Sequence, residues 1–532
     1  MARGLSRKLR LAGVLSVGTG LLLGTAPAHA DDYTDLLGLL RAKGSLTQGE
    51  YAGLLSKHVG SGARATEGRR SSRTAEGRRG RGTATTGNLA TDDAVAQAQA
   101  AAAAASASAA AAQEAAQSAK VELASPDLVR AAPYVPGQGV DIRVGNIDLN
   151  FSGFVNGFYT YSSAAHSANT VAGGLADNSG FDSSAIRNGL LPAALIFKAS
   201  TTQDGIDLAA EFGVYPGIDS ANTSGPFNAN NGGSAVGLGT AGVDFRQVFV
   251  TAGTKRFGTV KVGRDIGIFG SDAILSDATL LSVGGTGGNA NPANTSLGRI
   301  GIGYIYADFM PQITYSSPIM AGFQATVGVF QPLNEVNFAG GGLSSVATAH
   351  SAPMFQGKLT YDYKAGATAA RVWLGGLVQQ QQDVGGLASN VARPGDQVVG
   401  AGEVGAKIDS GPFGAVGYFY RARGVGTTGL MFDGLSPTGA LRNSEGFYAQ
   451  GSFKPAKKLK LVGSYGESSL FQAPGEISPT LVRRNAATIG AAYYSLTDWM
   501  TLVAEYAHVQ THNNAGDGID QNVFTAGTIL FF

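Results

Sequence analysis

Three short motifs in this sequence of 532 residues have residue types that could perform chemistry, but each lacks the context that its chemistry needs. The segment GLGTAG, from Gly237 to Gly242, matches a dinucleotide-binding fingerprint, yet a predicted strand follows it where a helix should begin. His508 and His512 would share a face of a helix as metal ligands, whereas on a strand they lie ~13 Å apart. Asp517-Gly518-Ile519-Asp520 offers too few oxygen ligands for Ca²⁺. We therefore expect no catalytic residue, no metal, no cofactor and no enzymatic activity.

The composition excludes further classes of protein. Cys is absent, which excludes a disulfide scaffold, a zinc ribbon and a thiol nucleophile. The 39 basic residues nearly balance the 38 acidic ones, so no basic excess points to a nucleic-acid partner. Gly contributes 78 residues and charged residues only 14 %, which fits neither a disordered chain nor an average soluble enzyme.

The elements that must position any functional side chain are strands. From Leu149 to Tyr161, apolar residues such as Phe151 and Val155 alternate with polar ones such as Asn150 and Ser152. This period of two is typical of a strand between two different environments. The same pattern predicts sixteen strands, at 149–162, 190–200, 204–214, 243–253, 257–264, 309–317, 321–331, 353–364, 367–379, 397–408, 411–423, 444–454, 457–467, 484–494, 498–509 and 521–532.

The gaps between the predicted strands alternate strictly between short turns and long loops, and 265–308 is the longest loop. An even number of strands with short turns on one side and long loops on the other is typical of an outer-membrane β-barrel. A barrel of this size encloses an aqueous channel, so the polar residue of each alternating pair should face the lumen. We therefore predict an all-β fold, a sixteen-stranded antiparallel transmembrane β-barrel preceded by a short helical extension.

The two ends of the chain carry signals for export and assembly. Basic residues from Arg3 to Arg10 precede the apolar run Leu11–Leu23 and the small residues at Ala28 and Ala30, which predicts a cleaved signal peptide over 1–30. At the other end, the last strand carries Gly527, Leu530 and the terminal Phe532. This spacing resembles the signal that the outer-membrane assembly machinery recognises. We expect the mature chain in the outer membrane of a Gram-negative cell, in contact with its lipid and lipopolysaccharide.

The segment between the signal peptide and the barrel divides into three parts. Residues 31–60 predict a short helical pair, and residues 61–92 form a linker rich in Arg, Gly and Ser that cannot bury a core. Residues 93–139 are an Ala-rich helical spacer with a lead-in to the barrel at 140–532.

The barrel region resembles the general porins of Gram-negative bacteria, which are trimeric sixteen-stranded diffusion channels. The resemblance is carried by Asn150–Gly157, Phe245–Val250 and Phe257–Arg264. The last of these is similar to the fifth strand of the family, which leads into a third long loop that folds into the barrel and narrows the pore. The resemblance thus implies a homotrimer and a constriction loop at 265–308. Simple porins begin almost directly with the first strand, whereas the extension here resembles that of porin variants that attach to the cell wall. This resemblance implies that residues 31–122 bind peptidoglycan.

Selectivity in such a channel comes from pore width and from charges at the constriction. The predicted lumen-facing basic residues are Arg246, Lys261, Arg264, Lys358, Arg371, Arg421, Arg423, Lys460 and Arg484. The acidic residues assigned to the infolded loop are Asp265, Asp272 and Asp277. A basic wall opposite an acidic loop would create a transverse field across the pore. Glu211, Glu403 and Glu505 are also predicted to face inward, which leaves the ion preference open.

Three functions therefore remain open at this point. The first is passive diffusion of small hydrophilic solutes and ions through a porin. The second is a substrate-specific channel for sugars or organic anions. The third is a tether in which the barrel anchors an extension that binds the cell wall.

Overall fold

The alternation of apolar and polar residues closes into a β-barrel of sixteen antiparallel strands, which confirms the predicted fold. The computed structural model describes residues 129–218, 243–285 and 295–532. The signal peptide, the helical pair, the linker and most of the Ala-rich spacer therefore lie outside the described residues. Within the described ranges, no helix is long and apolar enough to cross a bilayer.

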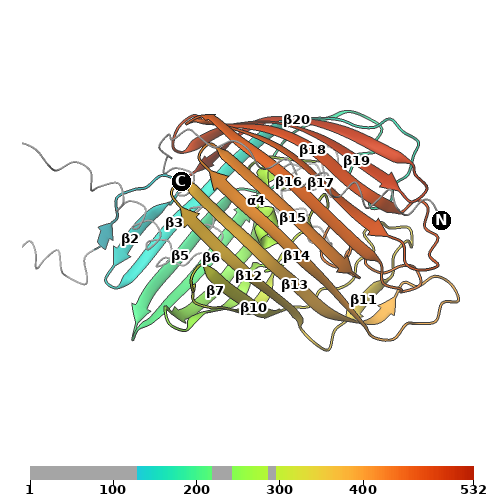
Figure 1. Ribbon diagram of the computed structural model, residues 1–532, viewed down its shortest axis with the longest axis horizontal. Coiled ribbons are helices and arrows are strands. Elements are labelled where there is room, and N and C mark those ends of the chain that lie inside the picture. The colour runs from blue at the N-terminus through green and yellow to red at the C-terminus, as the bar shows by residue number, and fades with distance from the viewer. Residues whose placement is uncertain (1–128, 219–242, 286–294) are drawn as a thin grey trace, which may run out of the picture.

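The strands of the wall lie side by side and inclined to the barrel, as Figure 1 shows. In chain order they are β3 (Ile147–Ser163), β5 (Ala194–Gln203), β6 (Ile206–Pro216), β7 (Val243–Thr254), β8 (Gly258–Ile266), β9 (Phe309–Ser316), β10 (Phe323–Phe330), β12 (Met354–Ala365), β13 (Thr368–Gly385), β14 (Gln397–Ser410), β15 (Phe413–Arg423), β16 (Asn443–Ala456), β17 (Leu459–Phe471), β18 (Val482–Ser495), β19 (Met500–Asn513) and β20 (Gly518–Phe531). Each strand pairs with its predecessor in this order, and β20 closes the barrel by pairing with β3.

Four shorter strands extend the wall without adding to the ring. They are β1 (Val129–Ala131), β2 (Val140–Val144), β4 (Ser183–Arg187) and β11 (Val346–Ala349). β20 pairs with residues 154–163 of β3, and β2 pairs with residues 147–151. β2 and β20 therefore lie end to end beside β3, and this places the start of the described chain next to its carboxy terminus.

Short turns join the strands at one end of the barrel, and long loops join them at the other. The turn between β5 and β6 consists of Asp204 and Gly205, both with positive φ (52° and 79°). Two successive residues with positive φ fit the tight hairpin turn that matches the twist of antiparallel strands. Outer-membrane barrels have their short turns on the periplasmic side, so the long loops here are extracellular.

The two faces of each strand differ in the way that the alternation predicts. On β3, Val155 and Tyr159 are half exposed on the outer face, while Asn156 and Thr160 are buried toward the interior. Gly153 also lies on the outer face, where an added Cβ would come within 2.7 Å of the ring of Phe532. The missing side chain at Gly153 thus makes room for the terminal aromatic ring across the closure of the barrel.

One predicted strand begins later than the sequence indicated. We expected a strand from residue 190, but β5 starts at Ala194 because residues 188–193 turn into the barrel. The side-chain amide of Asn156 donates hydrogen bonds to the carbonyls of Leu191 (2.8 Å) and Pro192 (3.3 Å). Pro192 has no amide hydrogen for a strand ladder, so the chain takes this inward path instead.

Candidate functional site

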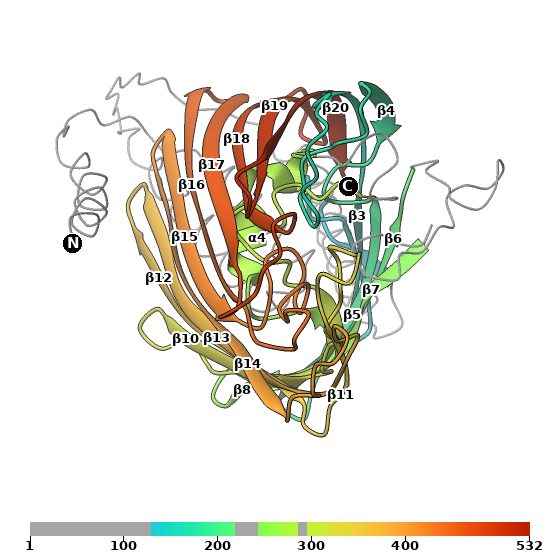
Figure 2. The same cartoon turned by 90° about the vertical axis from the view of Figure 1, so that its right-hand side faces the viewer.

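The described residues of the longest loop lie inside the barrel. Loop L3, defined as residues 267–308, follows β8 and carries the helix α4 (Ser271–Ser276) and the 3₁₀ turn η2 (Ala278–Leu281). Figure 2 looks into the barrel and shows α4 within the ring of strands. Most of the described residues of L3 are buried, because they pack against side chains of the inner wall.

Hydrogen bonds attach L3 to the wall at β14, β16 and β19, and others join it to residues 189 and 190 before β5. The carboxylate of Glu403 on β14 accepts from the backbone amide of Gly270 (2.8 Å), and that of Glu505 on β19 accepts from Gly284 (2.6 Å). Between these points, the hydroxyl of Tyr448 on β16 donates to the carbonyl of Ala273 (2.8 Å). Buried backbone groups need such partners, so these inward polar residues fix the path of the loop.

An ion-pair cluster joins α4 to the next part of the wall. Asp272, in the first turn of α4, pairs with Lys358 on β12 and with Arg371 on β13 (3.1 Å). Arg371 also makes two hydrogen bonds to Asp362, of 2.7 and 2.8 Å. Burial alone would raise the pKa of Asp272, but the charges of Lys358 and Arg371 hold it below its usual range.

The opposite wall carries its own buried charges on the inner faces of β5, β6 and β8. Lys198 lies 3.6 Å from Glu211, its cross-strand neighbour, and both side chains are buried. Lys261 pairs with Asp265, which also accepts a hydrogen bond from Gln247 (2.9 Å). Asp265 lies near the end of β8, so it belongs to the wall and was wrongly assigned to the loop. Opposite charges thus neutralise each other within this wall.

A narrow gap remains between L3 and the wall formed by β3, β6, β7 and β8. It holds a cavity of about 120 Å³. Arg246, Arg264 and Tyr215 line it from the wall, whereas Ile300 and Tyr306 line it from L3. We call this gap the slot. Arg246 and Arg264 were both predicted pore-lining residues, and the structure brings them together here.

Three of the predicted lumen-facing arginines lie on the outer surface instead. Arg421 and Arg423 alternate with the buried Tyr418 and Tyr420, which face the interior. Because β15 carries aromatic residues on both faces, its hydrophobic pattern did not reveal which face was inside. Arg484 follows an irregularity in the pairing of β18 and lies 3.5 Å from Glu467 on the outer face.

Two other predicted pore residues have different surroundings from those expected. Asp277 is buried within L3, where it lies 3.4 Å from the guanidinium of Arg299 and accepts a hydrogen bond from Tyr304 (2.9 Å). Its charge is therefore balanced inside the loop. Lys460 pairs across strands with the inward-facing Tyr493, near the short turn before β17, so it faces the lumen at the periplasmic end.

A second loop enters the barrel, and the sequence analysis did not anticipate it. Loop L6, residues 424–442, buries Val425, Leu430 and Met431 and meets L3 where the backbone amide of Tyr306 donates to the carbonyl of Thr428 (2.9 Å). L6 was predicted as an outer loop because a short apolar run carries no period. Lys198 was not among the predicted pore residues, because the apolar Ile196 shares its inward face.

The extracellular loops are joined by a buried ionic network. We name residues 331–353 loop L4 and residues 472–481 loop L7. Arg442 donates to Glu476 of L7 (3.0 Å) and to Ser344 of L4 (2.8 Å). Glu335 of L4 accepts from the backbone amides of Gly434 and Leu435 in L6. Burial raises the pKa of Glu335 well above its usual range. Three loops are therefore held together over the extracellular end.

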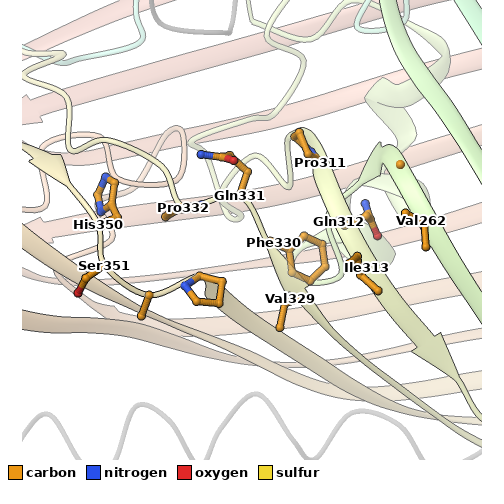
Figure 3. A pocket seen from close by; sticks show the side chains of 13 residues that line it. Val262, Pro311, Gln312, Ile313, Val329, Phe330, Gln331, Pro332, His350 and Ser351 are labelled. Carbon is orange, nitrogen blue, oxygen red and sulfur yellow. The ribbon is translucent and has the colours of Figure 1, made fainter.

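A wider hollow lies outside the lumen. Figure 3 shows it between β8, β9 and β10, bordered by His350 of L4. Its volume is about 580 Å³, and its lining includes Val262 and Ile313, which are exposed on the outer face. It therefore opens on the outer surface and does not belong to the slot.

Comparisons with known proteins agree with this architecture. The family model described as "Gram-negative porin" matches residues 98–521. A search by sequence among curated proteins found no significant relative. Among solved structures, the outer membrane channel DcaP of Acinetobacter baumannii is 15% identical with a TM-score of 0.53, over 73% of this chain and 98% of that one. The anion-selective porin from Comamonas acidovorans is 14% identical with a TM-score of 0.48, over 73% and 100%.

The family match covers far more than half of the chain, and the closed sixteen-stranded barrel is the fold that the porin resemblance implied. This chain belongs to the Gram-negative porin family and is an outer-membrane channel for the passive diffusion of small solutes.

Proposed function

We propose that the slot is the constriction of the permeation pathway and that its arginines give the channel a preference for anions. The attachment of L3 carries this proposal. On the side of β12, β14, β16 and β19, side chains of the wall hydrogen-bond directly to the backbone of L3 and hold it against that side. On the other side, the cavity between L3 and the wall provides space at the depth of the loop.

The charges around the slot support the anion preference. Asp272 and Asp277 of L3 are both paired, so the loop does not present a strong negative face. Arg246, Arg264 and Asp308 line the slot, which makes its lining formally positive by one charge. A positively charged constriction favours anions. The sequence predicted a transverse field between a basic wall and an acidic loop. Because Asp272 and Asp277 are paired, L3 contributes less negative charge to this field than predicted.

Planar-bilayer recordings of the purified full chain test both parts of this proposal. We expect stepwise conductance and, across a tenfold KCl gradient, a reversal potential with the sign of chloride selectivity. Replacing Arg246 with Gln should shift this potential toward zero. Arg421→Gln removes the same charge from the outer face, where the side chain is 71% exposed, and should leave the potential unchanged. A lack of conductance steps would refute the channel, and cation selectivity would refute the role of the arginines.

We also propose that the channel is a homotrimer, as the family resemblance implies. The measurement is the mass of the protein in mild detergent by light scattering, corrected for bound detergent. A monomeric mass that persists in native lipid nanodiscs would contradict the proposal.

A tethering role for residues 31–122 is the second candidate, and the position of β2 favours it. β2 continues the sheet past the carboxy terminus at the short-turn end, and Tyr134 contacts Trp499 there with ring centroids 5.6 Å apart. Val129 therefore lies at the periplasmic end of the barrel, on the side where the cell wall is. Deletion of residues 31–122 should preserve conductance but abolish sedimentation with purified peptidoglycan. Unchanged sedimentation would remove this candidate.

A further inference from the structure

The slot has an unusual lining for a pathway that passes small hydrophilic solutes. Most of the residues that line it carry apolar side chains, with Leu280, Leu297 and Ile300 from L3 facing Phe154 and Tyr215 from the wall. Ligand sites in proteins have this character, a mainly apolar pocket with a few polar groups that fix orientation. A constriction built only for water and inorganic ions has no need of it.

Two arginines bring positive charge to the slot. The guanidinium carbon of Arg246 lies 5.4 Å from the ring centre of Tyr215 and 5.7 Å from that of Phe309. These aromatic rings hold the buried Arg246 in place beside the cavity. Arg264 also lines the slot and is only partly buried, and it makes no hydrogen bond or ion pair with any residue that the structure describes. Its guanidinium therefore has donors available for a carboxylate.

The volume limits the size of what can occupy the slot. At about 120 Å³ the cavity is slightly smaller than an engineered apolar cavity of about 150 Å³ that binds benzene. A single small ring or a short branched chain matches this space, whereas a sugar would place many of its hydroxyl groups against the leucines and isoleucines of the lining. Unsatisfied polar groups in such a place are costly.

We infer that the slot is a binding site for small organic monoanions with an apolar body, such as aromatic carboxylates. The carboxylate would meet Arg264, beside the positive charge of Arg246, and the apolar body would pack against Leu280, Leu297 and Ile300. This inference rests on the proposed function, because it makes the constriction a specificity site as well as a passage. A solute that crosses the channel must bind weakly enough to leave again. While it is bound, it occupies the passage and reduces the chloride current.

The test uses benzoate as the probe and chloride current through the full-length channel as the readout. Benzoate should reduce the chloride current with a saturable dependence on concentration. Acetate has the charge without the ring, and benzamide has the ring without the charge, so each should block at least tenfold more weakly than benzoate. Benzamide equal to benzoate would overturn the role of the arginines, and acetate equal to benzoate would overturn the role of the apolar lining.

Two variants locate the site. Arg264→Gln should raise the half-blocking concentration of benzoate about tenfold, the usual effect of losing a hydrogen bond to a charged group. Arg421→Gln is the matched control on the outer face and should leave that concentration unchanged. Equal values for the two variants would overturn the assignment of the slot. Failure of this inference can be distinguished from failure of the proposed function, because a channel that conducts chloride but is not blocked by benzoate contradicts only this inference.

Discussion

Replacement of Asp272 by Asn tests how strongly the ion pairs of α4 hold L3 against the wall. Asp272 is 7% exposed and Lys358 is 14% exposed, so the variant leaves a buried ammonium that keeps its hydrogen bond to the hydroxyl of Ser271 (2.8 Å) but loses its closest carboxylate. Removing one partner of a buried ion pair costs about 3–5 kcal/mol. Asn keeps one acceptor oxygen and Arg371 keeps Asp362, so we expect the lower end, about 3 kcal/mol.

The assay for this variant is denaturant unfolding of the folded barrel in lipid vesicles, combined with single-channel recording. The expected result is a lower free energy of unfolding, more current noise from a loosened L3, and stronger anion selectivity from the lost negative charge. Asp362→Asn is the matched control, because Asp362 contacts the same arginine but is 42% exposed. It should cost less than about 1 kcal/mol. If both variants lower the free energy of unfolding equally and leave the current noise unchanged, the claim that Asp272 holds L3 against the wall is refuted.

The same ion pairs predict a response to pH. The pKa of Asp272 is lower in the folded protein than in the unfolded chain, so its charge stabilises the folded loop at neutral pH. This contribution is present above the unfolded pKa of about 3.9 and is lost as the pH falls through the lower folded value. Current noise in the unaltered channel should therefore stay constant down to about pH 4 and rise below it. Asp272→Asn channels should show no such rise.

Three further predictions concern the closure, the extracellular loops and the extension. Gly153→Ala places a Cβ 2.3 Å from the carbonyl of Ala194 and should reduce the fraction of heat-modifiable, folded barrel on gels, whereas Gly463→Ala meets nothing within 4 Å and should not. Burial raises the pKa of Glu335, so this carboxyl favours the folded loops below its unfolded pKa of about 4.3, and that contribution is lost as the pH rises through the raised value. Glu335→Gln should therefore make loop proteolysis independent of pH between 5 and 8, and a persisting dependence would contradict the assignment. Deletion of residues 31–122 should leave single-channel conductance within experimental error, and a changed conductance would show that the extension reaches the lumen.

The wall of the barrel could be predicted from the sequence because one physical rule governs all of it. Each strand separates hydrocarbon from an aqueous or packed interior, so the period of two persists and the turns interrupt it. The strand predicted at 309–317 is β9 (Phe309–Ser316), and that at 397–408 is β14 (Gln397–Ser410). The predicted strand start at residue 190 was wrong because Pro192 and the hydrogen bonds of Asn156 draw the chain inward.

The site could be predicted only where polarity alternated without interruption. Glu403 and Glu505 were correctly placed inside, but their attachment of L3 depends on loop backbone that no period describes. Arg421 was misplaced because Tyr418 and Tyr420 pack inside against the loops and are as apolar as their outward neighbours. The infolding of L6 left no periodic signal at all. The inner and outer faces of strands can thus be predicted from the sequence, whereas contacts between loops cannot.

The most direct test of the central claim uses the absence of Cys, since a single introduced thiol can be modified without side reactions. Leu297→Cys places a thiol on the L3 side of the slot. Ile477→Cys places one in L7, where the side chain is 90% exposed, as a control that reacts without obstructing the pathway. Current is recorded while a small, charged thiosulfonate reagent is added. If the slot is the passage, modification of Leu297→Cys reduces the current and modification of Ile477→Cys does not. A full current through Leu297→Cys channels after confirmed modification would contradict the account.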